Sequence, residues 1–154
     1  MSRFTGAGST YGLARGDLIL VRVTATNTYG TGVVSAANSA GAQVREVPGL
    51  NSQMAAPTRG ALTSISQIVV DWAALVAPTN GDSAIDSYHL TWDRGTGTWT
   101  DLVGISSNYL QLSYTVGTGI TPGNPYKFQV RAHNIYGWGP ASSKATILAS
   151  EVPA

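Results

Sequence analysis

Few residues in this sequence could do chemistry, and their spacing places no catalytic group. There are two histidines, His89 and His133, and no cysteine. Each histidine falls at an outward position of an expected strand, so we interpret both as solvated surface residues and not as half of a catalytic pair. Asp71, beside Trp72, is interpreted as a surface charge in the same way. Because no Ser-His-Asp set or carboxylate pair can be placed, we predict that the chain is not an enzyme and uses no cofactor.

Two short motifs resemble known recognition sites. Asn80-Gly81-Asp82 with Asp86 offers oxygen ligands, but it lacks the loop length and the terminal glutamate of an EF-hand. Asparagine and glycine tolerate positive φ, so we expect a turn there and no metal site. Arg15-Gly16-Asp17 spells the tripeptide that integrins recognise. We favour a Gly-Asp turn that leads into a strand.

The better candidate for a contact site is Tyr136-Gly137-Trp138-Gly139-Pro140, which the sequence indicates as a loop. A tryptophan between two glycines is poorly placed to enter the core of its own domain. We therefore predict contact residues at Asn134, Tyr136 and Trp138, with Tyr29 at the matching place of an earlier stretch. Contact between repeats or chains is the favoured role, and stacking of Trp138 on a glycan is the alternative.

The elements that must position these residues have the period-two pattern of half-buried strands. Apolar and polar residues alternate over 112–116 and 126–132, on either side of a turn rich in glycine and proline. We expect further strands within 66–72, 88–92 and 144–150, and a short one around Trp99. Strands of this kind joined by tight turns predict an all-β protein.

Residues 52–153 resemble the fibronectin type III family. The segment from Ile120 to Tyr126 is similar to the tyrosine corner of sandwich domains, in which a tyrosine hydroxyl bonds to upstream backbone. The run A-x-N-x-x-G-x-G-x-x-S follows from Ala132 to Ser143. The order and spacing of the remaining markers also fit: Pro57, Trp72, Tyr88 and Trp99. The resemblance implies an immunoglobulin-like β-sandwich.

Part of this pattern occurs twice. The stretch from Val23 to Gly30 lines up with that from Val130 to Gly137, and Val47-Pro48 returns as Val152-Pro153 roughly 105 residues later. Residues 1–48 therefore resemble the F and G strands at the end of one repeat. Residues 49–56 are interpreted as a linker and 57–154 as a complete domain. Ile19 and Arg15 occupy the corner positions of the first copy, which therefore lacks the tyrosine corner.

The texture of these repeats, rich in glycine, serine and threonine, is similar to that of very large surface proteins of ciliated protists. This resemblance implies a tandem array, from which the chain would be a window.

The first copy raises a packing problem. The run of residues 17–23 is apolar enough to be buried on both faces, yet a lone two-stranded hairpin is marginal in water. We expect the apolar side chains of this assembly hairpin to need a partner surface: Leu18, Leu20, Val21 and Val23. That surface could be the complete domain, a neighbouring molecule or upstream sequence. Edge-to-edge strand addition onto another copy is one way to supply it.

Composition limits the class of partner. Charged residues make up 11% of the chain and the net charge is +1, which argues against nucleic acid and anionic membranes. No stretch of eighteen residues is continuously apolar, so we expect no membrane insertion. Weak charge repulsion suits close association between copies. No N-x-S/T site occurs, while the many serines and threonines leave O-glycosylation open.

These observations predict a structural or adhesive building block of an extracellular or cell-surface repeat protein or filament. It would act through neighbouring repeats or copies of itself, by self-assembly. Two alternatives stay open. A carbohydrate- or protein-binding module would use the Trp138 loop, and replacing that tryptophan would abolish binding while leaving the fold intact. A non-catalytic accessory domain of a secreted enzyme would have a catalytic domain beside it.

Overall fold

The computed structural model describes residues 12–151, and the elements within that range are all strands. Backbone contacts divide the chain into two units, Met1–Glu46 and Val47–Ala154, here called the hairpin unit and the sandwich unit. In the part of the chain that is described, no helix is long and apolar enough to cross a membrane. The pair Val152-Pro153, the second member of the expected repeat of Val47-Pro48, lies outside the described residues.

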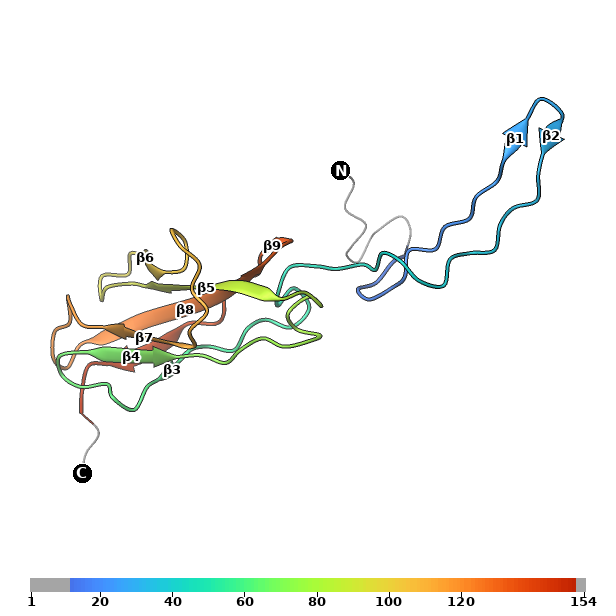
Figure 1. Ribbon diagram of the computed structural model, residues 1–154. Coiled ribbons are helices and arrows are strands. Elements are labelled where there is room, and N and C mark those ends of the chain that lie inside the picture. The colour runs from blue at the N-terminus through green and yellow to red at the C-terminus, as the bar shows by residue number, and fades with distance from the viewer. Residues whose placement is uncertain (1–11, 152–154) are drawn as a thin grey trace. The chain divides into compact units, whose positions relative to one another are not determined.

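The sandwich unit has two antiparallel sheets, seen as two layers in Figure 1. One sheet has the order β3-β4-β7, with strands Thr58–Arg59, Ile68–Asp71 and Ser113–Val116. The other has the order β10-β8-β5-β6, and β9 also pairs with β8. Its strands are β5 Ile85–Trp92, β6 Thr100–Val103, β8 Pro125–Asn134, β9 Gly137–Trp138 and β10 Ala145–Leu148. The all-β sandwich prediction is confirmed.

The core lies between the two sheets and follows the period-two pattern of the sequence. Successive residues of a strand point to opposite faces, so every second residue of β8 enters the core. Four such residues are almost fully buried: Tyr126, Phe128, Val130 and Ala132. From the facing sheet come Ile68, Val70 and Val116, and β5 adds Tyr88, Leu90 and Trp92. Burial of these aliphatic and aromatic side chains supplies most of the folding free energy.

The tyrosine corner is confirmed. The Tyr126 hydroxyl accepts a hydrogen bond from the backbone N–H of Thr121 at 2.7 Å and donates one to the carbonyl of Gly119 at 3.3 Å. Its ring is buried and stacks on Trp92 with centroids 5.6 Å apart. One side chain therefore joins the connection between the sheets to the core.

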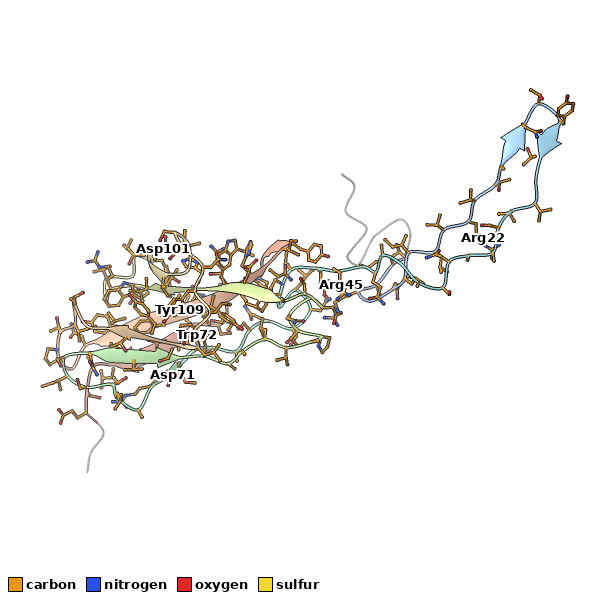
Figure 2. All side chains as sticks on the ribbon, viewed as in Figure 1. Arg22, Arg45, Asp71, Trp72, Asp101 and Tyr109 are labelled. Carbon is orange, nitrogen blue, oxygen red and sulfur yellow. The ribbon has the colours of Figure 1, made fainter. Side chains whose placement is uncertain are left out.

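The other end of the core holds Trp72. Its ring lies 6.2 Å from those of Tyr88 and Tyr109, and Figure 2 shows Trp72 and Tyr109 within the sandwich. The hydroxyl of Tyr88 accepts a hydrogen bond from the N–H of Leu75 at 3.1 Å. These contacts hold the loop after β4 against the core.

The segment expected as a linker, residues 49–56, packs as part of the sandwich unit, whose backbone contacts begin at Val47. Met54 is 4% exposed and belongs to the hydrophobic core. The N–H of Gly49 bonds to the carbonyl of Thr79 at 2.8 Å, and the Gln53 amide donates to the carbonyl of Ala141. Sequence alone indicated a linker because Gly, Asn and Ser lie near the start of this segment, and its two large apolar residues, Leu50 and Met54, are too few to define a strand pattern.

The hairpin unit is one antiparallel ribbon. Strands β1 Thr26–Asn27 and β2 Gly30–Thr31 form its tip, and backbone hydrogen bonds continue the pairing between the two arms away from the tip. Val23 accepts from Ser35 at 2.9 Å and Ile19 donates to Ala42 at 2.9 Å. An isolated bridge joins Leu18 to Gln43. In Figure 2 the side chains of the two arms project from a ribbon that, within the described residues, has no third strand paired to it.

The apolar side chains of the hairpin are exposed in this unit by itself, as expected for an apolar run without a partner surface. Val23 is 66% exposed, whereas its counterpart in the repeat alignment, Val130, is 1% exposed. Leu20 and Val21 are exposed as well, and Leu18 is half-buried. The physical reason is that the described part of this unit has no sheet facing the two arms, and two strands can shield only each other.

Candidate functional site

The outer face of the larger sheet carries the densest group of polar and aromatic side chains. Outward positions alternate with core positions, so His89 and Thr91 on β5 lie on the same face as Gln129 and Arg131 on β8. The register pairs His89 with Arg131 and Thr91 with Gln129. This pairing brings together side chains that are 42 residues apart along the chain in the case of His89 and Arg131.

A relay of hydrogen bonds fixes these groups. The Nε of Arg131 donates to Nδ1 of His89 at 3.0 Å, and Nε2 of His89 lies 2.8 Å from Oδ1 of Asp101. Arginine cannot accept, so Nδ1 must be unprotonated and Nε2 must carry the proton that is donated to Asp101. His89 is therefore the neutral Nε2–H tautomer, and it orients the guanidinium of Arg131. Figure 2 shows Asp101 on β6, the edge strand.

Burial lowers the pKa of His89 below its ordinary 6.5, because a charged imidazole would lose its hydration there. The hydrogen bond to Asp101 opposes this shift, and the positive charge of Arg131 adds to it. The neutral form assigned from the hydrogen bonds is thus the form that the environment favours at neutral pH. The prediction that His89 is a solvated surface residue is wrong, since it is 5% exposed beneath Trp138 and Arg131.

Trp138 does not project from a loop. It lies on β9, which forms a tight hairpin with the end of β8, and His133 pairs directly with Trp138. Its half-buried ring lies 4.7 Å from the ring of His133 and 5.6 Å from that of His89, and the Arg131 guanidinium lies 4.9 Å from its centroid. A cation over an indole face is attracted by the ring quadrupole. The loop interpretation failed because two residues between paired strands suffice for a turn.

Asn134 makes that turn and is not available to a partner. It is fully buried, its amide donates to the carbonyl of Asn80 at 3.0 Å, and its Oδ1 accepts from the N–H of Tyr136 at 2.9 Å. Gly137 completes the turn with a φ of 127°. Of the predicted contact residues, Tyr136 is exposed at the turn, and Tyr29, at the tip of the hairpin unit, is 97% exposed.

The second histidine is also paired. Nδ1 of His133 lies 2.6 Å from Oδ1 of Asp86, which links β8 to the start of β5. His133 is half-buried, so the surface interpretation holds only in part. The ring of Trp138 contacts the rings of both histidines.

The two short motifs both form turns. Gly81 has a φ of 75°, its N–H bonds to the carbonyl of Pro78, and Oδ1 of Asn80 accepts from the N–H of Asp82. Gly16 has a φ of 85°. Oδ2 of Asp17 accepts from the N–H of Ala14 at 2.8 Å, which closes the turn before the first arm of the hairpin.

A pocket of about 200 Å³ opens beside the relay, lined in part by Thr91, Trp99, Gln129 and Arg131. These residues come from separate stretches of the sequence, and no motif groups them. Thr91, Gln129 and Arg131 are polar residues of alternating strand patterns, which the sequence does show. Which polar residue of β5 lies beside which residue of β8 depends on the register between the two strands.

Comparisons with known proteins agree with this architecture. The sequence model of the fibronectin type III domain matches residues 56–147, which is more than half of the chain. The chain belongs to the fibronectin type III family. A comparison with curated protein sequences returned no significant match.

Solved structures show the same fold at low identity. The sixth fibronectin type III domain of human fibronectin type III domain containing protein 3 matches with a TM-score of 0.53 and 19% identity, over 76% of this chain and 96% of that one. The solution structure of the fourth fibronectin type III domain of a human protein matches with a TM-score of 0.57 and 15% identity, over 84% of this chain and 97% of that one. Domains A168–A170 of titin give 0.50 and 19%, over 70% of this chain and 34% of that one.

Proposed function

We propose that this chain is a structural building block of an extracellular or cell-surface repeat protein, acting through repeat-to-repeat and chain-to-chain contacts. Domains of this family commonly serve as structural or binding modules. The single observation that carries the proposal is the unpaired hairpin. Its residues 23–30 resemble residues 130–137 of the sandwich, but Val23 is open to solvent where Val130 is buried.

Strand β8 is the counterpart of the hairpin arm in the sandwich unit, and its neighbours show which pairing the arm lacks. In the sandwich unit, β5 pairs with β8 from Ile85 to Trp92, and β10 pairs with its other edge. Among the described residues, the hairpin arm that contains Val21 and Val23 pairs only with the opposite arm. An open strand edge with apolar side chains favours pairing with another strand, and the neighbouring copy of the chain is the partner we assign.

The surface composition supports assembly. A net charge of +1 and a charged fraction of 11% leave little electrostatic repulsion between copies. Thr58 and Thr121 are exposed beside prolines, so O-glycosylation of an extracellular form would be sterically accessible. A filament of tandem repeats is the assembly that we infer from these features.

The test is the mass of the intact chain in solution, measured by analytical ultracentrifugation over a concentration series. We expect growth into dimers or larger species. A double variant, Val21→Thr with Val23→Thr, keeps β-branched side chains but removes apolar area, and it should shift association to higher concentration. Val76→Thr is the control, because Val76 is exposed on the sandwich unit. A strict monomer at every concentration would overturn the chain-to-chain contact.

A further inference from the structure

We propose that the pocket between Thr91, Trp99, Gln129 and Arg131 binds the carboxylate of a single sugar-acid ring. This site lies on the outer face of β5 and β8 and does not involve the hairpin unit. The proposal is therefore independent of assembly. It rests on the fixed guanidinium of Arg131, on the aromatic wall and on the size of the pocket.

The guanidinium of Arg131 is held in place by two neighbouring side chains. Its Nε is bonded to His89, and Trp138 holds the guanidinium carbon at 4.9 Å from the ring centroid. Within the described residues, its two terminal nitrogens have no hydrogen-bond partner. A guanidinium held on one edge and one face, with its remaining donors free, is arranged for bidentate binding of a carboxylate.

An aromatic side chain forms one wall of the pocket. Trp99, just before β6, lines the pocket, and the ammonium of Lys144 lies 5.6 Å from its ring centroid. Indole rings pack against the apolar faces of sugar rings as well as against other flat groups. Lys144 adds a second cation near the pocket. Asp101, the carboxylate of the relay, is engaged by His89.

Gln129 and Thr91 line the pocket with neutral polar groups. Nε2 of Gln129 donates to the carbonyl of Ser142 at 3.0 Å, so its Oε1 is left as an acceptor. The hydroxyl of Thr91 makes one long contact of 3.5 Å with the carbonyl of Gln129. An acceptor and a hydroxyl beside a cation match the hydroxyl groups and the carboxylate of a sugar acid.

Size decides between one ring and a longer ligand. A volume of about 200 Å³ lies below the roughly 300–1,000 Å³ that pockets for drug-sized ligands occupy. The pocket therefore takes one ring, whether that ring is a free sugar acid or one residue of an acidic glycan. A ring without a carboxylate would lack the charged partner that a guanidinium binds most strongly.

The experiment is an NMR titration of the intact chain with sodium glucuronate, glucose and acetate at pH 7.4 and constant ionic strength. We expect saturable shifts of the Trp99 indole N–H and the Arg131 Nε–H with glucuronate. Binding of glucose and of acetate should each be at least tenfold weaker, because each lacks one half of the recognised group. An oligomer of glucuronate distinguishes the sources, since tighter binding assigns the pocket to glycan chains and equal binding assigns it to free sugar acids. Both results support the proposal.

The variants make the test decisive. Arg131→Gln should weaken glucuronate binding at least tenfold, whereas Lys127→Gln, on the same face of the same strand but outside the pocket, should change it less than twofold. If Arg131→Gln does not fold, Arg131→Lys keeps the charge and should still weaken binding several-fold, because the fork is lost. Equal binding of glucose and glucuronate, or unchanged binding by both Arg131 variants, would overturn the proposal.

Discussion

The guanidinium of Arg131 donates to Nδ1 of His89 across two neighbouring strands, at 3.0 Å. The same histidine donates from its other nitrogen to Asp101 on the next strand. Three strands of the sheet are thereby joined on their outer face by one neutral imidazole. The protonation state of His89 is consequently coupled to the stability of the sheet.

Stability should fall as the pH drops below about 6.5, the ordinary pKa of histidine. The folded-state pKa of His89 is lowered by burial, so between that value and 6.5 the unfolded chain binds more protons than the folded one. Folding is then penalised progressively as acid is added, until the folded histidine is also protonated. Urea unfolding at pH 7.5, 6.0 and 5.0 measures this effect. His89→Gln should flatten this part of the profile, and an unchanged slope would contradict the assignment.

The tyrosine corner should contribute through its hydroxyl alone. Tyr126→Phe removes the partner of the Thr121 N–H and the Gly119 carbonyl while leaving the buried ring in place. We expect a loss of about 1–2 kcal/mol in the free energy of unfolding. Urea denaturation provides the measurement. Tyr114→Phe is the matched control, because Tyr114 contacts the ring of Tyr109 and its hydroxyl has no partner in the described structure. Equal losses in both variants would exclude a specific role for the corner.

Replacing Gly139 tests how firmly the segment before residue 57 packs on the sandwich, because Gly139 lies against the backbone of Pro48. A Cβ at Gly139 would lie 1.9 Å from the carbonyl oxygen of Pro48, so one of the two backbones must move. We expect Gly139→Ala to destabilise the domain by about 3 kcal/mol, the upper range for overpacking. Gly117→Ala is the control, since nothing lies within 4 Å of its added Cβ. A thermal melt of Gly139→Ala equal to that of the control would show that the segment is loosely attached.

Substitutions of Trp138 and Tyr136 should differ in their effect on the free energy of unfolding, because only the Trp138 ring packs against the sheet. Trp138→Leu loses the cation–π contact with Arg131 and the ring contacts with both histidines, for an expected cost of at least about 1 kcal/mol. Tyr136→Ala should cost less than about 0.5 kcal/mol, as is usual for an exposed surface position. Chemical denaturation of both variants provides the comparison. The reverse order would mean that the turn, and not the Trp138 ring, anchors β9.

The strands and the core were determined by local patterns that sequence carries directly. Tyr126, Phe128, Val130 and Ala132 point to the same face because the side-chain period of a strand is two, whatever its neighbours are. The tyrosine corner was equally predictable, since its donor and acceptors lie within seven residues of one another. The exposed apolar row of the hairpin also followed from the short run that contains Val21 and Val23.

What tertiary structure alone decided is the pairing of residues far apart in the chain. Only the register between β5 and β8 places Arg131 beside His89, and a slip of β5 by one residue would turn His89 into the core and away from Arg131. The turn at Asn134 is similar, because its buried amide depends on the carbonyl of Asn80 from a distant loop. Met54 became a core residue for the same reason. Local sequence sets which face a residue takes within its strand, while packing between distant segments sets what that face meets.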